Sequence, residues 1–230
     1  MRNEETYPVC LMLANRRCLV AGGGAVAQRK IRMLLKSGAA VTCLADRATP
    51  FIRKLARSRK ISLVRRRILR TADVRSFLKG MTLVIAATSS REINRMISRE
   101  CLRRNLLINV VDDLELSNFI VPAVVRRGAL NLAVSTGGRS PELAKRIREK
   151  LEKIFGREYR AFLEFMAEER GKILSRVLAP GKRKKVFRAI ARSKLLKYFK
   201  AKEPGKAAAH YRRILSEQGV LGCFEKNPRS

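Results

Sequence analysis

Short apolar runs alternate with segments of helical periodicity through the first 110 residues. The apolar runs are Arg17–Val20, Val41–Ala45, Ile61–Val64, Leu83–Ala87 and Leu106–Val111. The helical patterns between them are Arg29–Lys36, Pro50–Arg57, Val74–Leu78 and Glu92–Arg103. Short, continuous apolar strands that alternate with helices are typical of a parallel sheet with both faces covered. Ligands of such sheets bind outside the carboxyl ends of the strands.

The first apolar run ends in three glycines, and a helical pattern follows at once. The segment fits the dinucleotide-binding pattern G-x-G-x-x-A, with Gly22, Gly24 and Ala27 at its defined positions. There the first glycine permits the tight turn, the second lets the backbone approach a pyrophosphate, and the small third residue allows close packing of helix on strand. The start of the helix that follows offers free N–H groups and a partial positive charge to the phosphates. The turn predicts dinucleotide binding; the alternative is a strand–helix–strand unit that binds no ligand.

Two further positions at strand ends are candidate cofactor contacts. Asp46 follows the second strand, 22 residues after Gly24, near the place where such folds carry the carboxylate that binds the adenosine ribose. NAD is therefore the expected cofactor. Arg47 comes next and could instead attract the 2′-phosphate of NADP, while Asp46 could merely start a turn. Thr88 follows the fourth strand and lies beside the cofactor or simply ends the strand.

The pattern changes from Phe119 onward. Phe119–Val125 and Leu130–Ser135 predict two strands around a turn. A helix follows, with Ser140 as its N-cap and Pro141 at its first position. Two strands alone are marginally stable in water, so we expect them to pack on a second subunit and the protein to be a homodimer.

The predicted helix and the remaining residues complete the architecture. The expected buried stripe of the helix is Leu143, Ile147, Leu151, Ile154 and Phe155. The rest is mostly helical, with an interruption at Pro180. The sequence thus predicts an α/β fold, a Rossmann-like parallel sheet with a small β-rich dimerisation segment and a helical C-terminal domain. We expect these three parts to cover residues 1–113, 114–145 and 146–230.

The charge of the chain is extreme. It holds 52 Lys and Arg against 19 Asp and Glu, a formal net charge of +33. Such a field attracts polyanions, whether nucleic acid, membrane phosphate or a small polycarboxylate. No zinc-finger spacing or RNA-recognition pattern is evident and aromatic residues make up only 6%, so we do not expect a nucleic-acid partner. A nucleic-acid-binding protein or a cofactor sensor, each built on a Rossmann core, stays the alternative.

Other composition features set the expected compartment. No apolar run approaches the roughly 18 to 20 residues that span a bilayer, and the first residues have no secretory pattern, so we expect a cytoplasmic protein without a membrane partner. The five cysteines form no C-x-x-C pair and are expected to be reduced core residues. His210 is the one histidine, and no Cys/His cluster predicts a metal site.

Three segments, in the order in which they occur, carry a resemblance to a known family. The first is residues 21–30, around the glycine turn. The second is Asn109-Val-Val-Asp-Asp113, followed by Ser117-Asn-Phe-Ile120 and Pro122, and the third is Ser135-Thr-Gly-Gly-Arg-Ser-Pro141. Together with Leu83–Thr88 they resemble the precorrin-2 dehydrogenase family of sirohaem synthesis, which includes the N-terminal module of sirohaem synthase and its stand-alone relatives. The resemblance runs from about Tyr7 to Phe155. No methyltransferase domain follows, so we expect the stand-alone form.

The resemblance implies NAD-dependent oxidation of precorrin-2 to sirohydrochlorin. Precorrin-2 is a polycarboxylate, which suits a basic protein. By the resemblance, Asp112 is the general base that takes the proton lost when hydride leaves for the nicotinamide. The alternative is that Asp112 and Asp113 only form a turn or a cap. Some family members also insert ferrous iron as a second substrate; Asp112 could serve both steps, and the sequence leaves that activity open.

The resemblance also implies contacts with the cofactor at Ala25, Val26, Asp46 and Arg47. It implies contacts with the substrate at Asn109, Ser135, Thr136 and Arg139. Thr136 occupies a place where relatives often carry serine; its hydroxyl could bind a substrate carboxylate or cap the turn. Arg126, Arg127 and Arg139 are candidate carboxylate clamps because guanidinium binds carboxylates in a bidentate manner. Each of the three could equally be ordinary surface.

Overall fold

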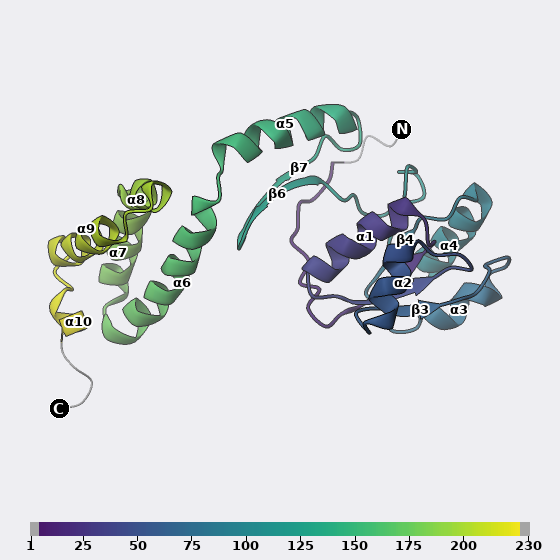
Figure 1. Ribbon diagram of the computed structural model, residues 1–230, viewed down its shortest axis with the longest axis horizontal. Helices are drawn as coiled ribbons and strands as arrows, with labels where there is room; N and C mark the ends of the chain where they lie inside the picture. The colour runs from purple at the N-terminus through teal and green to yellow at the C-terminus, as the bar shows by residue number, and fades with distance from the viewer. Residues whose placement is uncertain (1–4, 226–230) are drawn as a thin grey trace. The chain divides into compact units, whose positions relative to one another are not determined.

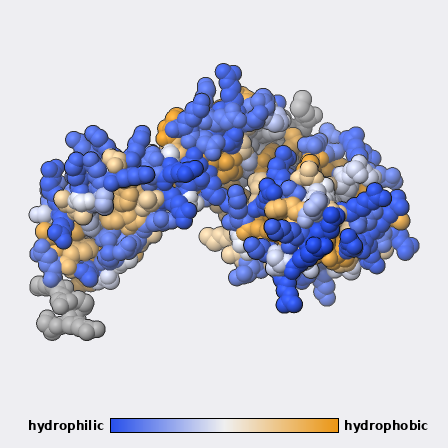
Figure 2. Space-filling view, viewed as in Figure 1, coloured by the Kyte–Doolittle hydropathy of each residue, from blue (hydrophilic) through white to orange (hydrophobic). Residues whose placement is uncertain are grey.

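The computed structural model describes residues 5–225, and the chain forms two compact units, Met1–Val121 and Pro122–Ser230 (Figure 1). Residues 114–121, expected to belong with the dimerisation strands, group with the first unit. No helix in the described part of the chain is long and apolar enough to cross a membrane. Hydrophilic side chains cover most of the visible surface of both units (Figure 2), as the net charge of +33 requires.

The first unit is built on a five-stranded parallel sheet of order β3-β2-β1-β4-β5. The strands are β1 (Arg17–Ala21), β2 (Ala40–Leu44), β3 (Ser62–Val64), β4 (Leu83–Ala86) and β5 (Leu107–Val110). The helices are α1 (Ala25–Lys36), α2 (Pro50–Arg57), α3 (Ala72–Leu78) and α4 (Arg91–Arg103). The predicted Rossmann-like fold is confirmed.

Both faces of this sheet are buried, which explains why its strands are continuously apolar. Along β1, Cys18 and Val20 belong to the core that α1 and α2 cover, whereas Leu19 and Ala21 belong to the core under α3 and α4. All four side chains are fully buried. β1 pairs with β2 on one side and β4 on the other, so the strand order reverses there. The crevice at the carboxyl ends of β1 and β4 is where such folds bind ligands.

The second unit contains a two-stranded antiparallel sheet and a set of helices. The strands are β6 (Ala123–Arg127) and β7 (Leu130–Val134); the helices are α5 (Pro141–Ile154), α6 (Glu158–Arg176), α7 (Pro180–Arg192), α8 (Leu195–Ala201), α9 (Pro204–Glu217) and α10 (Gly222–Glu225). Ile173, Ile190 and Leu195 are fully buried at the centre of the helical part. Ser140 caps α5 by accepting a hydrogen bond from the Leu143 amide, as predicted.

Two expectations for this region are wrong. Phe119–Pro122 is not part of the first strand, because the Phe119 carbonyl accepts a hydrogen bond from Asn109 and its ring packs on the first unit's core. The predicted stripe of α5 is only partly buried among the described residues: Leu151 and Phe155 are half-buried, whereas Leu143 is 49% exposed and Ile154 65%.

Candidate functional site

The predicted glycine turn joins β1 to α1 and touches both neighbouring strand ends. Gly22 has φ of +118°, and an added Cβ would lie 2.3 Å from the carbonyl oxygen of Ala87, after β4. Its amide donates to the Leu44 carbonyl at the end of β2, 2.9 Å away. Ala27 is fully buried where α1 packs on the sheet. The turn and packing roles expected of Gly22 and Ala27 are therefore seen in the structure.

The middle glycine has a role that the sequence pattern leaves unassigned. A Cβ on Gly23 would lie 2.0 Å from the Arg47 carbonyl oxygen, so only glycine fits against the loop after β2. The Thr49 amide donates to the Gly23 carbonyl at 3.0 Å, and the Thr49 hydroxyl donates to Gln28 at 2.7 Å. This contact joins residues more than twenty positions apart, so no local signal predicts it.

The start of α1 fits a phosphate group. Gly24 is the N-cap; it is exposed, and an added Cβ would have no atom within 4 Å. No side chain caps the helix, and its first turn carries no acid. The amides that follow, from Ala25 and Val26 onward, therefore lack the side-chain acceptor that usually satisfies them. A dinucleotide pyrophosphate supplies the acceptor and the negative charge that this helix end favours.

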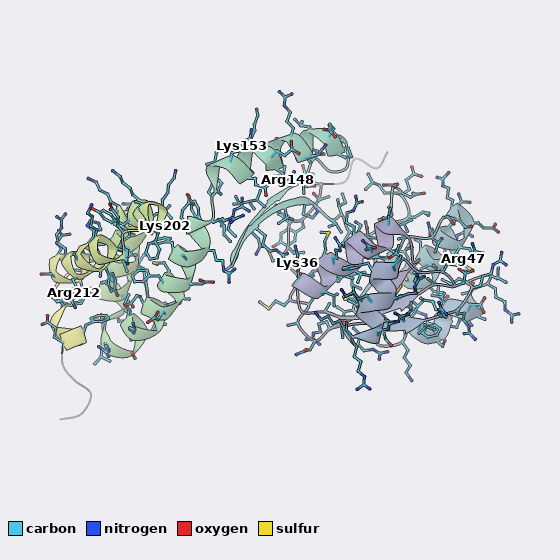
Figure 3. The ribbon with its side chains drawn as sticks, viewed as in Figure 1. Lys36, Arg47, Arg148, Lys153, Lys202 and Arg212 are labelled. Atoms are coloured by element: carbon cyan, nitrogen blue, oxygen red, sulfur yellow. The ribbon has the colours of Figure 1, made fainter. Side chains whose placement is uncertain are left out.

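Asp46 and Arg47 both lie exposed in the loop between β2 and α2. Figure 3 labels Arg47 and Lys36 in the first unit; Lys36 is the last residue of α1, at the end away from the glycine turn. Thr88 lies next to the glycine turn. If Gly22 carried a Cβ, that atom would lie 3.1 Å from the amide nitrogen of Thr88. Its hydroxyl is already used: it donates to Asn94 on α4 at 2.7 Å and accepts from the Ser90 amide. The side chain of Thr88 thus stabilises the loop after β4.

The two adjacent acids after β5 differ in their surroundings. Asp113 is 13% exposed; its carboxylate accepts from Arg91 at 3.3 Å and from the Leu116 amide at 3.3 Å. Asp112 is exposed, has φ of +60°, and its carboxylate has no hydrogen bond to any of the described residues. Asp112 therefore lies in the turn after β5 and Asp113 has the capping role, as the alternative for these acids expected, while the Asp112 carboxylate itself stays exposed.

Polar side chains hold the segment that carries these acids. Ser117 accepts from the Val110 amide at 2.9 Å and donates to the Asp113 carbonyl at 2.8 Å. Asn118 accepts from the Ile108 amide at 2.8 Å and donates to the Leu106 carbonyl at 2.9 Å. These side chains provide hydrogen-bond partners for backbone groups on the outer edge of β5, as a sixth strand would. The motif Ser117-Asn118 was expected only by resemblance, and the structure supplies its physical reason.

A cavity of about 210 Å³ opens beside the acids, at the carboxyl ends of β4 and β5. Its lining is Ser89, Arg91, Asn94, Val110, Val111, Asp112 and Asp113. Asp112 and the glycine turn share the same edge of the sheet, so a bound dinucleotide and the carboxylate face one crevice.

Asn109 is a buried residue whose amide group has partners within the protein. Its nitrogen donates to the Phe119 carbonyl at 3.2 Å, and its oxygen accepts from the amino group of Lys30 at 3.4 Å. Burial lowers the pKa of Lys30, nearby Arg29 lowers it further, and the Asp112 charge opposes both. Asn109 does not line the cavity. In this arrangement it fixes the strand that leads to Asp112.

The remaining predicted substrate residues lie in the second unit, in the loop between β7 and α5. Ser135 accepts from the Gly137 amide, and Thr136 both accepts from the Ser140 amide and donates to the Ser140 carbonyl. The hydroxyl of Thr136 thus stabilises the loop. The amide of Arg139 donates to the Thr136 carbonyl, and its side chain is exposed.

Two further arginines were candidate carboxylate clamps. Arg127 bonds to the Phe155 and Glu152 carbonyls at the end of α5, which makes it a structural contact. Arg126 donates to Asn131 across the hairpin.

The five cysteines are all free. Burial raises the pKa of the Cys18 and Cys43 thiols to about 11, so both stay neutral core residues, and the Cys43 thiol donates to the Gly22 carbonyl at 3.4 Å. Cys10 and Cys223 are exposed, so the expectation that they are core residues is wrong. No group of three or more His, Cys, Asp or Glu side chains in residues 5–225 has the arrangement of a metal site. His210 packs its ring against Tyr198 in the helical part of the second unit.

Comparison with known families identifies the chain. Residues 9–123 match a family described as "Putative NAD(P)-binding", and residues 127–154 match one described as "Sirohaem biosynthesis protein central". The chain belongs to this NAD(P)-binding family, and residues 127–154 also match the central segment of sirohaem biosynthesis proteins. The resemblance expected from the three motifs is thereby confirmed.

Individual relatives agree with this family. The siroheme synthase of Methylobacillus flagellatus is 40% identical over 185 residues, which are 80% of this chain and 38% of that protein. That of Psychromonas ingrahamii is 41% identical over 148 residues, 64% of this chain and 30% of that protein. The chain thus spans less than two fifths of the length of these relatives. The solved structure of "SirC, precorrin-2 dehydrogenase" has a TM-score of 0.74 and 26% identity, covering 93% of this chain and 99% of its own.

Proposed function

We propose that this chain oxidises precorrin-2 to sirohydrochlorin with a nicotinamide dinucleotide, and that Asp112 is the general base. One observation carries the proposal: the Asp112 carboxylate is exposed and unbonded among the described residues, while the adjacent Asp113 is fully engaged. The similarity to a structure named precorrin-2 dehydrogenase supports the choice of substrate.

The glycine turn would hold the cofactor. Gly22 allows the tight turn, Gly24 leaves the backbone open, and the uncapped amides at the start of α1 would bind the pyrophosphate. When bound, the nicotinamide supplies the acceptor for a hydride. NAD is the cofactor we expect from Asp46, whose carboxylate would accept hydrogen bonds from the ribose hydroxyls.

Asp112 has one task in this reaction. Precorrin-2 loses two hydrogens: one leaves as hydride with its electron pair, and the other leaves as a proton. The carboxylate of Asp112 accepts that proton and passes it to solvent, which its exposure allows. General base catalysis typically contributes about 10²- to 10⁴-fold to rate. The many positive side chains of the protein would attract the substrate's carboxylates.

The test is direct. Purified protein is incubated without oxygen with fresh precorrin-2 and NAD⁺ or NADP⁺, and sirohydrochlorin is followed by its absorption. We expect product to form only with a nicotinamide cofactor. Absence of conversion above a protein-free control, with cofactor binding measured separately, would refute the proposed reaction.

Insertion of ferrous iron is a second reaction of the same site. Sirohydrochlorin supplies the nitrogen ligands itself, so the protein needs only a group that accepts the displaced protons, and Asp112 is such a group. The expected result is sirohaem formation from sirohydrochlorin and ferrous iron without cofactor. A rate equal to that without protein would exclude this activity.

A homodimer is the assembly we propose. Leu143, Ile147 and Ile154 lie along one face of α5 at helical spacing and are 49%, 36% and 65% exposed. Apolar surface also shows near α5 in Figure 2. A second copy would bury this face and the adjoining hairpin. Sedimentation of the wild type should give a dimer and that of Ile147→Asp a monomer; a monomeric wild type would contradict the proposal.

A further inference from the structure

A second cavity, of about 350 Å³, lies in the helical part of the second unit. It opens where the end of α7 and the start of α8 meet α9. Its lining is Ala189, Arg192, Ser193, Lys194, Tyr198, His210, Arg213, Ile214 and Glu217. None of these residues belongs to the glycine turn or to the segment of Asp112, so the reaction proposed above leaves this cavity unexplained.

The inner wall of the cavity is apolar and aromatic. Ile214 is 4% exposed and belongs to the core of the helical part, and Ala189 packs half-buried against that core. The rings of Tyr198 and His210 meet edge-on, with their centroids 5.5 Å apart. Ligand cavities are typically apolar with a few polar groups, so this wall suits the flat body of a small organic molecule.

His210 brings an unsatisfied polar atom to this wall. Its Nε2 is covered by protein and has no hydrogen-bond partner among residues 5–225. Buried side-chain nitrogens normally have a partner, because an unpaired one loses the hydrogen bond it makes to water. The terminal torsion of histidine is broad, so a turn of the ring can present this nitrogen to a molecule in the cavity.

The rim of the cavity is positive. Arg213 forms an ion pair with Glu217 at 3.1 Å, which occupies the one acid of the lining. The side chains of Arg192 and Lys194 are exposed and form no hydrogen bond or ion pair with any other described residue. Two cations of the rim are therefore left without a counter-charge, which favours an anion at this position.

The corner that carries these two cations is fixed by hydrogen bonds. Ser193 stands between them and ends α7. Its hydroxyl donates to the Ile190 carbonyl at 2.8 Å and accepts from the Leu195 amide at 3.1 Å. Ile190 and Leu195 are themselves fully buried. The backbone of Arg192 and Lys194 is thus anchored to the core of the helical part.

We propose that this cavity binds a small organic anion, a carboxylate or a phosphate ester with a flat apolar body. The body would lie against Tyr198, His210 and Ile214. The charged group would accept hydrogen bonds from Arg192 and Lys194, and guanidinium binds both kinds of group in a bidentate manner. The site uses no residue of the dinucleotide crevice, so it is tested separately from the proposed function.

The single histidine makes this site directly observable. Because His210 is the one histidine in the chain, untagged protein made with ring-¹³C-labelled histidine gives one imidazole signal by NMR. The probes are benzoate, phenyl phosphate, the neutral analogue benzamide, and inorganic phosphate, which lacks the flat body. At constant pH and ionic strength, we expect benzoate or phenyl phosphate to shift this signal saturably, with an affinity about tenfold above that of benzamide or inorganic phosphate. The tighter of the two anions identifies the charged group.

Variants locate the anion within the cavity. Arg192→Ala removes an unpaired cation of the rim and should weaken the tighter anion about tenfold. Arg192→Lys keeps the charge without the bidentate geometry and should lose part of the affinity. Arg212→Ala is the matched control: Arg212, labelled in Figure 3, is an exposed arginine of α9 that does not line the cavity. Its loss should change the affinity by no more than about twofold.

Each alternative result overturns the proposal. A His210 signal that neither anion shifts would show that the cavity binds no such molecule. Benzamide bound as tightly as benzoate would show that the rim does not recognise charge, and inorganic phosphate bound as tightly as phenyl phosphate would show that the wall recognises no organic body. Equal losses in Arg192→Ala and Arg212→Ala would assign the binding to the general charge of the protein.

Discussion

The two halves of the crevice are built by different means. At the carboxyl end of β1, backbone packs against backbone: Gly22 and Gly23 allow the turn to contact the Ala87 and Arg47 carbonyls, where no side chain fits. At the end of β5, Ser117 and Asn118 hold the chain through side-chain hydrogen bonds. The first half leaves amides free for a cofactor, and the second leaves a carboxylate free for chemistry.

The two halves should therefore respond differently to substitution. A Cβ added at Gly22 or Gly23 meets backbone carbonyls, so the backbone must move to accommodate it. In the acid half, the hydrogen bonds are individually modest and are shared among several side chains.

The largest expected effect comes from Gly23→Ala. Its Cβ would be forced against the Arg47 carbonyl, 2.0 Å away, so we expect a loss of about 3 kcal/mol or failure to fold. Gly24→Ala is the matched control, because that Cβ meets open space, and should cost no more than about 1 kcal/mol. Chemical denaturation measures both. Equal stability of the two variants would show that the Arg47 carbonyl does not exclude a side chain at Gly23.

A smaller effect is expected from the acid half. Ser117→Ala removes the hydrogen bonds to the Val110 amide and the Asp113 carbonyl and should cost about 1–2 kcal/mol. Ser58→Ala is a control at an exposed site, where the lost hydroxyl bonds only the Leu55 carbonyl, and should be near neutral. If the denaturation curves of the two variants coincide, the hydrogen bonds of Ser117 do not contribute to the stability of the segment after β5.

A further effect depends on pH and lies on α4, the helix that carries Arg91 and Asn94. The hydrogen bond from Arg103 holds the pKa of Glu100 at about 2 against the opposing effect of burial, and Arg104 adds to it. A depressed carboxyl pKa stabilises the fold above its unfolded value of about 4.5, and that contribution is lost as pH falls from 4.5 towards 2. Glu100→Gln should therefore differ most from wild type at neutral pH. A difference in unfolding free energy that does not shrink below pH 4.5 would contradict this.

The sequence predicted those parts of the fold whose signals are local. The strands of the sheet lie within one or two residues of the apolar runs, and α2 spans Pro50–Arg57 as predicted, because Thr49 and Pro50 mark its start. The fixed spacing of the glycine turn likewise identified Gly22 and Ala27.

The parts that escaped prediction depend on contacts distant in sequence. Gly23 is required by a loop after the next strand, and the capping role of Asp113 depends on Arg91 on another element. The stripe on α5 has the right periodicity, but periodicity shows only that a face is apolar. It does not show whether the same chain or a second copy covers that face.

The adjacent acids Asp112 and Asp113 are proposed to have separate roles, catalysis for Asp112 and structure for Asp113. We would first compare Asp112→Asn and Asp113→Asn in cofactor-dependent precorrin-2 oxidation and in denaturation. We expect Asp112→Asn to keep wild-type stability and to lose about 10²- to 10⁴-fold in rate. Asp113→Asn should lose about 1–2 kcal/mol of stability and retain most of its rate. An Asp112→Asn protein that turns over at the wild-type rate would show that Asp112 is not the general base.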